Sequence, residues 1–220
     1  MEFTIKHQPS YSLLEMNLTP GESITAEAGA MVSMDKEMEV KTKVAGSFFA
    51  ALAKKFLGGE SVFINEFTAT ANATHITFAP QFPGDIGHVN LNGNTLVMQA
   101  GAYLCASPDV QISTKFGGMK SLFGGEGAFL LHATGTGDLF YSAYGAIIPI
   151  EVNGSYTLDT GHLVAFEPTL EYELKKVGGW KSTLLSGEGL VFNFTGTGKI
   201  WIQSRVPSGF IGWLTKLLPN

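Results

Sequence analysis

Five histidines are the residues of this sequence best suited to hold a metal ion or to transfer protons: His7, His75, His88, His132 and His162. A metal site on a β-rich enzyme usually places two histidines close together on one strand, with a carboxylate a few residues later. No His-x-His pair and no His-x-Asp or His-x-Glu pair occurs in the chain. We therefore predict no metal site, and expect the histidines to be partly buried strand residues bonded to the backbone.

Glutamate follows glycine at three recurring positions, Glu60, Glu126 and Glu188. Three carboxylates near one axis could bind a cation or shift one another's pKa. A glutamate at a strand entry also accepts hydrogen bonds from turn amides, and then recurs because the turn recurs. We favour this structural role, and predict no cofactor.

Nucleotide binding and nucleophilic catalysis have little support. Phosphate loops lead from glycine directly into a helix, whereas the Gly-Thr-Gly and Gly-Gly-Glu-Gly segments here lead into strand-like runs. A Gly-x-Ser-x-Gly elbow is absent, and the lone Cys105, in Tyr-Leu-Cys-Ala, is typical of an inert buried thiol. The sequence therefore predicts no catalytic residue and a protein that is not an enzyme.

Composition narrows the class of partner. The 220 residues are 45% hydrophobic and 15% charged, with a net charge of −5, so a broad basic footprint for nucleic acid is excluded. No unbroken apolar run reaches the roughly 18 residues of a membrane span. Because there is one cysteine and no signal-peptide pattern at the first residues, we expect a cytoplasmic protein.

The elements that must position these residues repeat along the chain. A turn of small residues follows a strand-like run at Gly29, Gly101 and Gly161, and the Gly-Glu pairs recur in the same order, about 60 to 70 residues apart. Two independent markers in one order indicate internal repetition. We predict one domain over residues 1–205 that holds three copies of one unit: about 3–78, 79–142 and 143–205.

Each unit consists of runs of β-branched and aromatic residues punctuated by glycine or asparagine, which predicts successive hairpins. The expected turns are Gly-Thr-Gly at 135–137 and 196–198 and Asn-Gly at 92–93 and 153–154. The copies are expected to share one interior around a pseudo-threefold axis. The predicted fold class is all-β, a double-stranded β-helix or barrel-like sandwich with one or two short helices.

Helix is scarce outside the C-terminal tail. Residues 47–57 place Phe48, Phe49, Leu52 and Phe56 on one helical face. The corresponding glycine-led segments, 117–123 and 178–185, predict a helical turn or two each.

Residues 206–220 predict an amphipathic helical tail. Helical spacing places its apolar side chains on one face, which is the candidate interaction surface: Phe210, Trp213, Leu214, Leu217 and Leu218. We expect this face to pack on its own barrel or on a neighbouring subunit. Peripheral contact with a membrane is the alternative, although one short helix with a single lysine binds membranes weakly.

Several segments together resemble the altered-inheritance-of-mitochondria protein 24 family, in its uncharacterised prokaryotic branch. They are Gly-Gly-x-Lys before Gly-Glu-Gly and residues 83–86, 144–147, 161–166 and 201–205. The resemblance implies a β-rich fold grouped with the tryptophan RNA-binding attenuation protein-like proteins, and homo-oligomerisation. The mitochondrial member is linked to inner-membrane organisation, and the family has no established catalytic residues to carry over.

The function predicted is therefore that of a non-enzymatic, homo-oligomeric scaffold or interaction module, with a protein partner possible. Its rival is a small-molecule- or metal-binding β-helix protein, with a site at the pseudo-threefold axis or between subunits that uses Glu126, His132, Tyr144 or His162. The third hypothesis is a peripheral membrane protein that binds through its helical faces.

Overall fold

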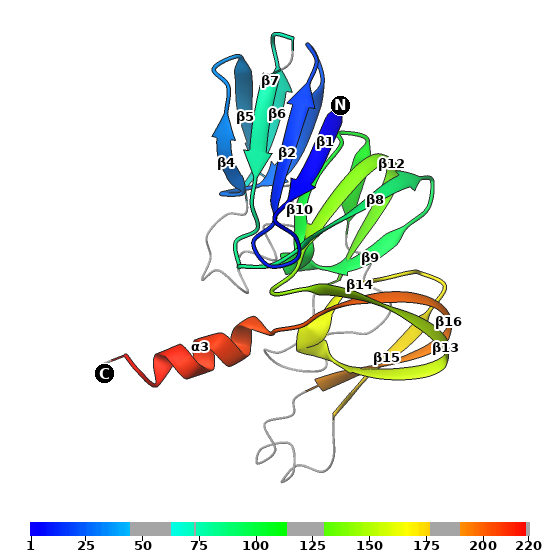
Figure 1. Ribbon diagram of the computed structural model, residues 1–220. Helices are drawn as coiled ribbons and strands as arrows, with labels where there is room; N and C mark the ends of the chain where they lie inside the picture. The colour runs from blue at the N-terminus through cyan, green and yellow to red at the C-terminus, as the bar shows by residue number, and fades with distance from the viewer. Residues whose placement is uncertain (45–62, 73, 114–129, 177–189, 219–220) are drawn as a thin grey trace.

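A computed structural model describes residues 1–44, 63–72, 74–113, 130–176 and 190–218 (Figure 1). Antiparallel strands dominate it, so the all-β fold class predicted from the sequence is confirmed. Residues 47–57, 117–123 and 178–185, where short helices are expected, lie outside the described residues.

The strands fall into three consecutive sections. Section 1 contains β1 (Glu2–Lys6), β2 (Leu13–Leu18), β3 (Ser23–Glu27), β4 (Met31–Met34), β5 (Met38–Val44), β6 (Phe63–Ala69) and β7 (Thr74–Phe78). Section 2 contains β8 (Ile86–Asn92), β9 (Leu96–Gln99), the short 3-10 helix η1 (Ala100–Ala102), β10 (Tyr103–Ala106), β11 (Val110–Ser113) and β12 (Leu130–Ser142). Section 3 contains β13 (Ile147–Asp159), η2 (Thr160–His162), β14 (Leu163–Phe166), β15 (Glu171–Lys176) and β16 (Leu190–Gln203), and helix α3 (Pro207–Thr215) follows it.

Each section is a long antiparallel ribbon with two further strands beside it, and section 1 has in addition β1, which pairs with β2. The ribbon is β2 and β3 against β7 and β6 in section 1, β8 and β9 against β12 in section 2, and β13 against β16 in section 3. The strand after the small-residue turn pairs with the ribbon in every section, as β4, β10 and β14. The next strand, β5, β11 or β15, pairs with its other half.

The hairpins predicted at the glycine motifs are wrong. The two Gly-Thr-Gly segments lie inside the continuous strands β12 and β16, and Asn153-Gly154 lies inside β13. Asn92-Gly93 does separate two strands, but β8 and β9 both pair with β12 and not with each other. Gly154 and Gly196 lie opposite each other with φ of 108° and 118°, so they bend the ribbon without reversing the chain.

The described buried side chains form three hydrophobic clusters, one in each section, and not the single shared interior that we expected. Phe67 and Phe78 pack in the first, Leu131 and Leu139 in the second, and Phe192 in the third. The physical reason is that each bent ribbon encloses its own apolar side chains. The neighbouring section also contributes, through the strand at the junction and, in the first cluster, through Ile86 of β8 and Phe140 of β12.

The segments that link the sections lie against one another. Gly84 and Gly145 form an isolated parallel bridge, and Arg205 N–H donates to Tyr144 O. Asp85 is buried, and its Oδ1 accepts hydrogen bonds from Ser12 Oγ and from the backbone N–H of Ile86, both at 2.9 Å. These contacts fix how each section follows the one before it.

Candidate functional site

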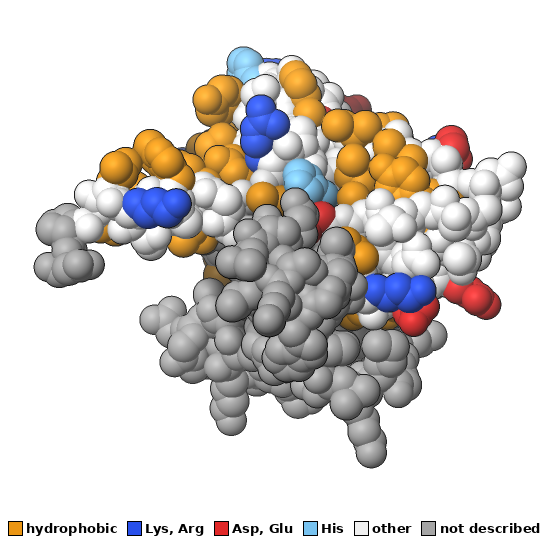
Figure 2. Space-filling view, turned by 90° about the horizontal axis from the view of Figure 1, so that it is seen from below, with side chains coloured by type: hydrophobic (Ala, Val, Ile, Leu, Met, Phe, Trp, Pro, Cys, Tyr) orange, Lys and Arg blue, Asp and Glu red, His pale blue; other side chains and the backbone are white. Residues whose placement is uncertain are grey.

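Helix α3 lies within the predicted tail and projects away from the sheets (Figure 1). None of its residues is buried, and the exposed fraction of Trp213 is 57%. Hydrophobic side chains follow the helix on the face seen in Figure 2. All five residues of the predicted interaction surface are exposed, as is Ile211: Phe210, Trp213, Leu214, Leu217 and Leu218. The chain's own sheets therefore leave this surface largely open.

Local sequence explains where α3 begins but gives the helix little stability of its own. Pro207 suits the first turn, because its missing N–H would have no partner there. No side chain caps the start, and Gly209 and Gly212 are poor helix formers. A helix of 9 residues is marginal in isolation, so we expect an apolar contact to stabilise it.

A groove of about 440 Å³ lies between the start of α3 and Tyr144, in the linker between sections 2 and 3. Aromatic rings continue from the linkers onto the helix. The ring centroids of Phe82 and Tyr144 are 5.6 Å apart, those of Tyr144 and Phe210 6.4 Å, and those of Phe210 and Trp213 6.0 Å. The groove and the helix therefore share one aromatic surface.

Two residues of the rival hypothesis, Tyr144 and His162, line this groove. His162 Nδ1 lies 2.7 Å from Gln203 O, and this carbonyl accepts a hydrogen bond from the ring. Gln203 Oε1 in turn accepts from the backbone N–H of Tyr144, and its Nε2 donates to Gly161 O. These polar groups hold the backbone of the linkers in place.

The other two residues of the ligand-binding hypothesis, His132 and Glu126, are not among the residues that line the groove. His132 lies on β12, and Glu126 lies outside the described residues, as do Glu60 and Glu188. The repeated glutamates and the expected threefold site are therefore not described by the structure.

The histidines have separate surroundings. His162 bonds to the backbone, as expected, whereas His75 lies within bonding distance of the Asn17 and Thr77 side chains. His88 Nε2 lies 2.8 Å from Asp138 Oδ1. Within the described ranges, no three His, Cys, Asp or Glu residues are placed to hold a metal ion.

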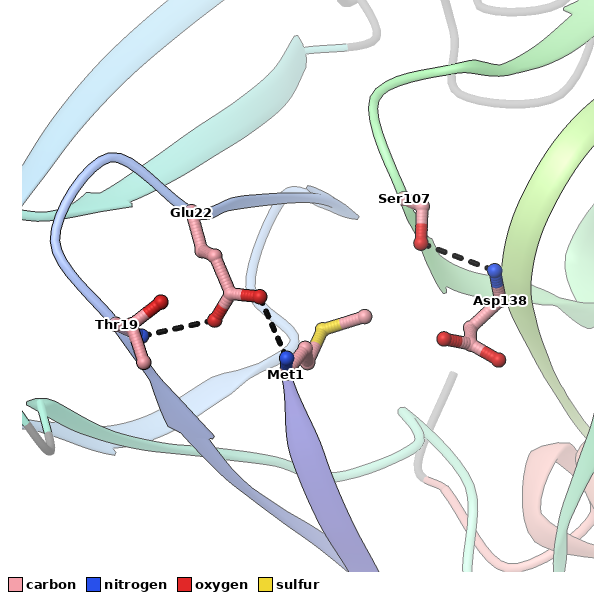
Figure 3. A network of polar contacts seen from close by, with 5 residues as sticks. All are labelled: Met1, Thr19, Glu22, Ser107 and Asp138. Atoms are coloured by element: carbon pink, nitrogen blue, oxygen red, sulfur yellow. Dashed lines mark hydrogen bonds and ion pairs between the residues drawn. The ribbon is translucent and has the colours of Figure 1, made fainter.

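Asp138 illustrates the balance of effects on a half-buried carboxylate. Partial burial favours its neutral form, but hydrogen bonds from Asn90 and His88 outweigh this and lower its pKa. Its backbone N–H also donates to Ser107 Oγ at 3.0 Å (Figure 3). This cluster joins β8 to β12 and the turn after β10.

Glu22, which the sequence did not single out, holds the turn between β2 and β3 (Figure 3). Its Oε1 lies 2.5 Å from the Met1 amino group, and its Oε2 accepts from Thr19 N–H at 2.8 Å. The amino group, and then Thr19, lower the pKa of Glu22. The contacts tie β1 to this turn.

A half-buried acid near Cys105 was also missed. Burial raises the pKa of Glu27 to about 7, and Tyr103 and Cys105 have pKa values raised well above their usual range by burial and by this carboxylate. Cys105 is fully buried, as predicted for an inert thiol. A signal was present, because Glu27 occupies the position before the small-residue turn where the other units have Gln99 and Asp159.

Fold and site together define a class: an antiparallel β protein that carries an exposed apolar helix at the end of its last section. The chain matches the model of the family described as mitochondrial biogenesis AIM24 over residues 3–205, and it belongs to that family. In the described residues, no helix is both long and apolar enough to cross a membrane.

Its relatives are uncharacterised bacterial proteins, as the resemblance implied. An uncharacterized protein of Streptococcus pyogenes serotype M6 is 30% identical over 229 residues, covering 100% of this chain and 92% of the relative. A crystal structure of a Streptococcus pyogenes protein, from a structural genomics consortium, superimposes with a TM-score of 0.81 at 29% identity and covers 99% of both chains.

Proposed function

We propose that this protein is a non-enzymatic, self-associating scaffold of the cytoplasm, and that α3 docks on a neighbouring copy. The observation that carries the proposal is the exposed helix. Contiguous exposed apolar side chains of this kind mark interaction sites in proteins. The aromatic groove beneath α3 extends the same surface onto the linkers.

A protein surface suits α3 better than a lipid surface. Interfacial helices combine an apolar face with several lysines or arginines, whereas Lys216 is the one basic residue from Pro207 to the end of the chain. The net charge of −5 also opposes approach to anionic lipid. Both points favour docking between proteins.

Support for a non-enzymatic role comes from the groove itself. His162 and Gln203 form hydrogen bonds with backbone groups. Among the described residues of the groove, no nucleophile is paired with a base. Apolar contact through Val206, Phe210 and Trp213 is what the groove and helix offer a partner.

The test compares the native mass of wild type with that of Trp213→Asp. We expect wild type to be an oligomer and the variant to dissociate at least about tenfold more readily, because a charge replaces a large contact side chain. Tyr11→Asp is the matched control, because Tyr11 is an aromatic residue with an exposed fraction of 72% that lies outside α3. Equal masses for wild type and Trp213→Asp would contradict the proposal.

The same proteins distinguish the alternative functions. Flotation with neutral and with anionic vesicles detects membrane binding. If wild type floats and Trp213→Asp does not, α3 binds membranes and the proposal of docking on a neighbouring copy is wrong. A metal ion or small molecule retained in the native mass would instead favour the ligand-binding hypothesis and direct attention to His162 and Tyr144.

A further inference from the structure

The junction between consecutive sections is built twice in the same way. In both cases, the strand after the small-residue turn pairs antiparallel with the strand that precedes this turn in the section before it: β10 with β3, and β14 with β9. The opposed residues are Cys105 with Ala26, Ala106 with Thr25, Ala165 with Met98, and Phe166 with Val97. The junction therefore has a fixed register relative to the turn.

The same two kinds of strand remain open at the two ends of the series. Section 1 has β4 after its turn, and β4 carries the same irregularity as β10 and β14, between Met31 and Ser33. Section 3 has the second half of β13 before its turn, ending at Asp159. Among the described strands, β4 pairs only with β7 and β13 only with β16.

The open edge of β4 also exposes apolar side chains. All residues of β10 and β14 are buried, whereas Met31, Val32 and Met34 have exposed fractions of 38%, 55% and 39%. An exposed apolar edge strand is a template for pairing with another strand. The strands β5, β11 and β15, by contrast, each pair with one ribbon strand of their own section. Their outer edges are open in all three sections, so none of them lacks a partner that its equivalents have.

The two open edges of one molecule cannot meet. Figure 1 shows β4 and β13 well separated, with section 2 between sections 1 and 3. A second copy of the chain, however, presents the missing edge with the required sequence and register.

We propose that β4 of one copy pairs antiparallel with the second half of β13 of a second copy, with Ser33 opposite Leu158 and Met34 opposite Thr157. This register follows from counting along each strand from the turn glycines Gly29 and Gly161, as in the two internal junctions. The inference rests on the proposed self-association. Because the edges differ, the contact is head to tail.

Two single-cysteine variants test the register directly. Met34→Cys and Thr157→Cys both place a thiol on an exposed position, while the native Cys105 is fully buried. Opposed residues of antiparallel strands lie about 4.5 to 5.5 Å apart at Cα, within the range of a disulfide. After mild oxidation, the mixture is expected to give a disulfide dimer of one copy of each variant, at least about tenfold more than either variant alone.

Glu151→Cys supplies the matched control for Thr157→Cys. Glu151 is an exposed residue of the same strand, six residues away and on the other side of the bend at Gly154, at a distance of at most about 20 Å. Its mixture with Met34→Cys should yield no such dimer. Equal dimer in both mixtures would overturn the proposed register.

Val32→Lys tests the surface without a cysteine. A lysine on β4 is expected to lower the native mass, while Val40→Lys on β5, with a native exposed fraction of 42%, keeps it. Equal effects of the two lysines would contradict pairing through β4.

The cysteine mixture repeated with Trp213→Asp in both chains separates this inference from the proposed function. Cross-linking that persists there supports edge pairing and shows that α3 is not required for it. If the cysteine mixture gives no cross-link even without Trp213→Asp, while wild type is an oligomer that Trp213→Asp dissociates, edge pairing alone is overturned. A monomer under every condition overturns both.

Discussion

Glu27 has different surroundings from Gln99 and Asp159, which occupy the same position in the other two sections. Gln99 donates to Thr160 O, and Asp159 accepts from Gly161 N–H at 2.8 Å. The Glu27 side chain is half-buried near Tyr103 and Cys105, and its partial burial raises its pKa from 4.5 to about 7. Ionising the Glu27 carboxyl therefore costs more free energy in the folded protein than in the unfolded chain.

This carboxyl makes stability depend on pH. Between its unfolded pKa of 4.5 and its folded pKa of about 7, the folded protein binds more protons than the unfolded chain, so stability falls as pH rises. The free energy of unfolding should fall by on the order of 2–3 kcal/mol between pH 5 and pH 8 from this group. Glu27→Gln, which copies section 2, should remove that fall.

Urea unfolding of both proteins at pH 5 and pH 8 measures the effect. The difference between the two proteins isolates the carboxyl, because every other side chain is the same in both. Parallel pH dependence would show that Glu27 has an ordinary pKa in the folded state.

At the level of elements, the linkers tolerate little added volume. A Cβ built on Gly84 would lie 1.8 Å from Ala143 O, on the backbone of the facing linker. Gly84→Ala must separate the two segments and should destabilise the protein by about 1–3 kcal/mol. Gly101→Ala is the control, because nothing lies within 4 Å of its Cβ and its φ is not positive. Thermal unfolding compares them, and equal midpoints would mean that the linkers shift freely.

The strands themselves could be predicted, because alternation of β-branched and aromatic residues with polar ones is a local pattern. The role of Gly154 and of the glycines in β12 and β16 could not. A glycine with positive φ serves equally in a turn and in a bend, and only the pairing partners distinguish them. The raised pKa of Glu27 could not be predicted either, because it depends on burial of β3 against β10 of the next section.

The candidate site also has one part that local sequence predicts and one part that depends on tertiary packing. Apolar spacing predicts a helical tail within residues 206–220 and the residues of its apolar face, although not that the chain's own sheets leave this face open. Where α3 projects, and that Tyr144 and His162 lie beneath it, depends on how the linkers cross. No local pattern encodes that crossing.

Across the whole molecule, the three sections form a series in which only section 2 has a described junction on both sides. Amides of β9 and β10 should therefore exchange with solvent at least about tenfold more slowly than those of β4, whose outer edge is open. The Val32→Lys protein is the form to measure, because a paired β4 would be protected. Hydrogen exchange followed by mass spectrometry gives the rates, and equal protection of both regions would contradict an open series.

The bend in each ribbon has a mechanical consequence. Residues 130–135 of β12 pair with β9 and β11, and the rest of the strand pairs with β8 and β10. One unbroken backbone therefore serves as a strap through both halves of the section. Tension that strips neighbours from one half is transmitted through the glycines to the other, so we expect sections 2 and 3 each to yield as a unit. Section 1 differs, because β2 and β3, and likewise β6 and β7, are separate strands.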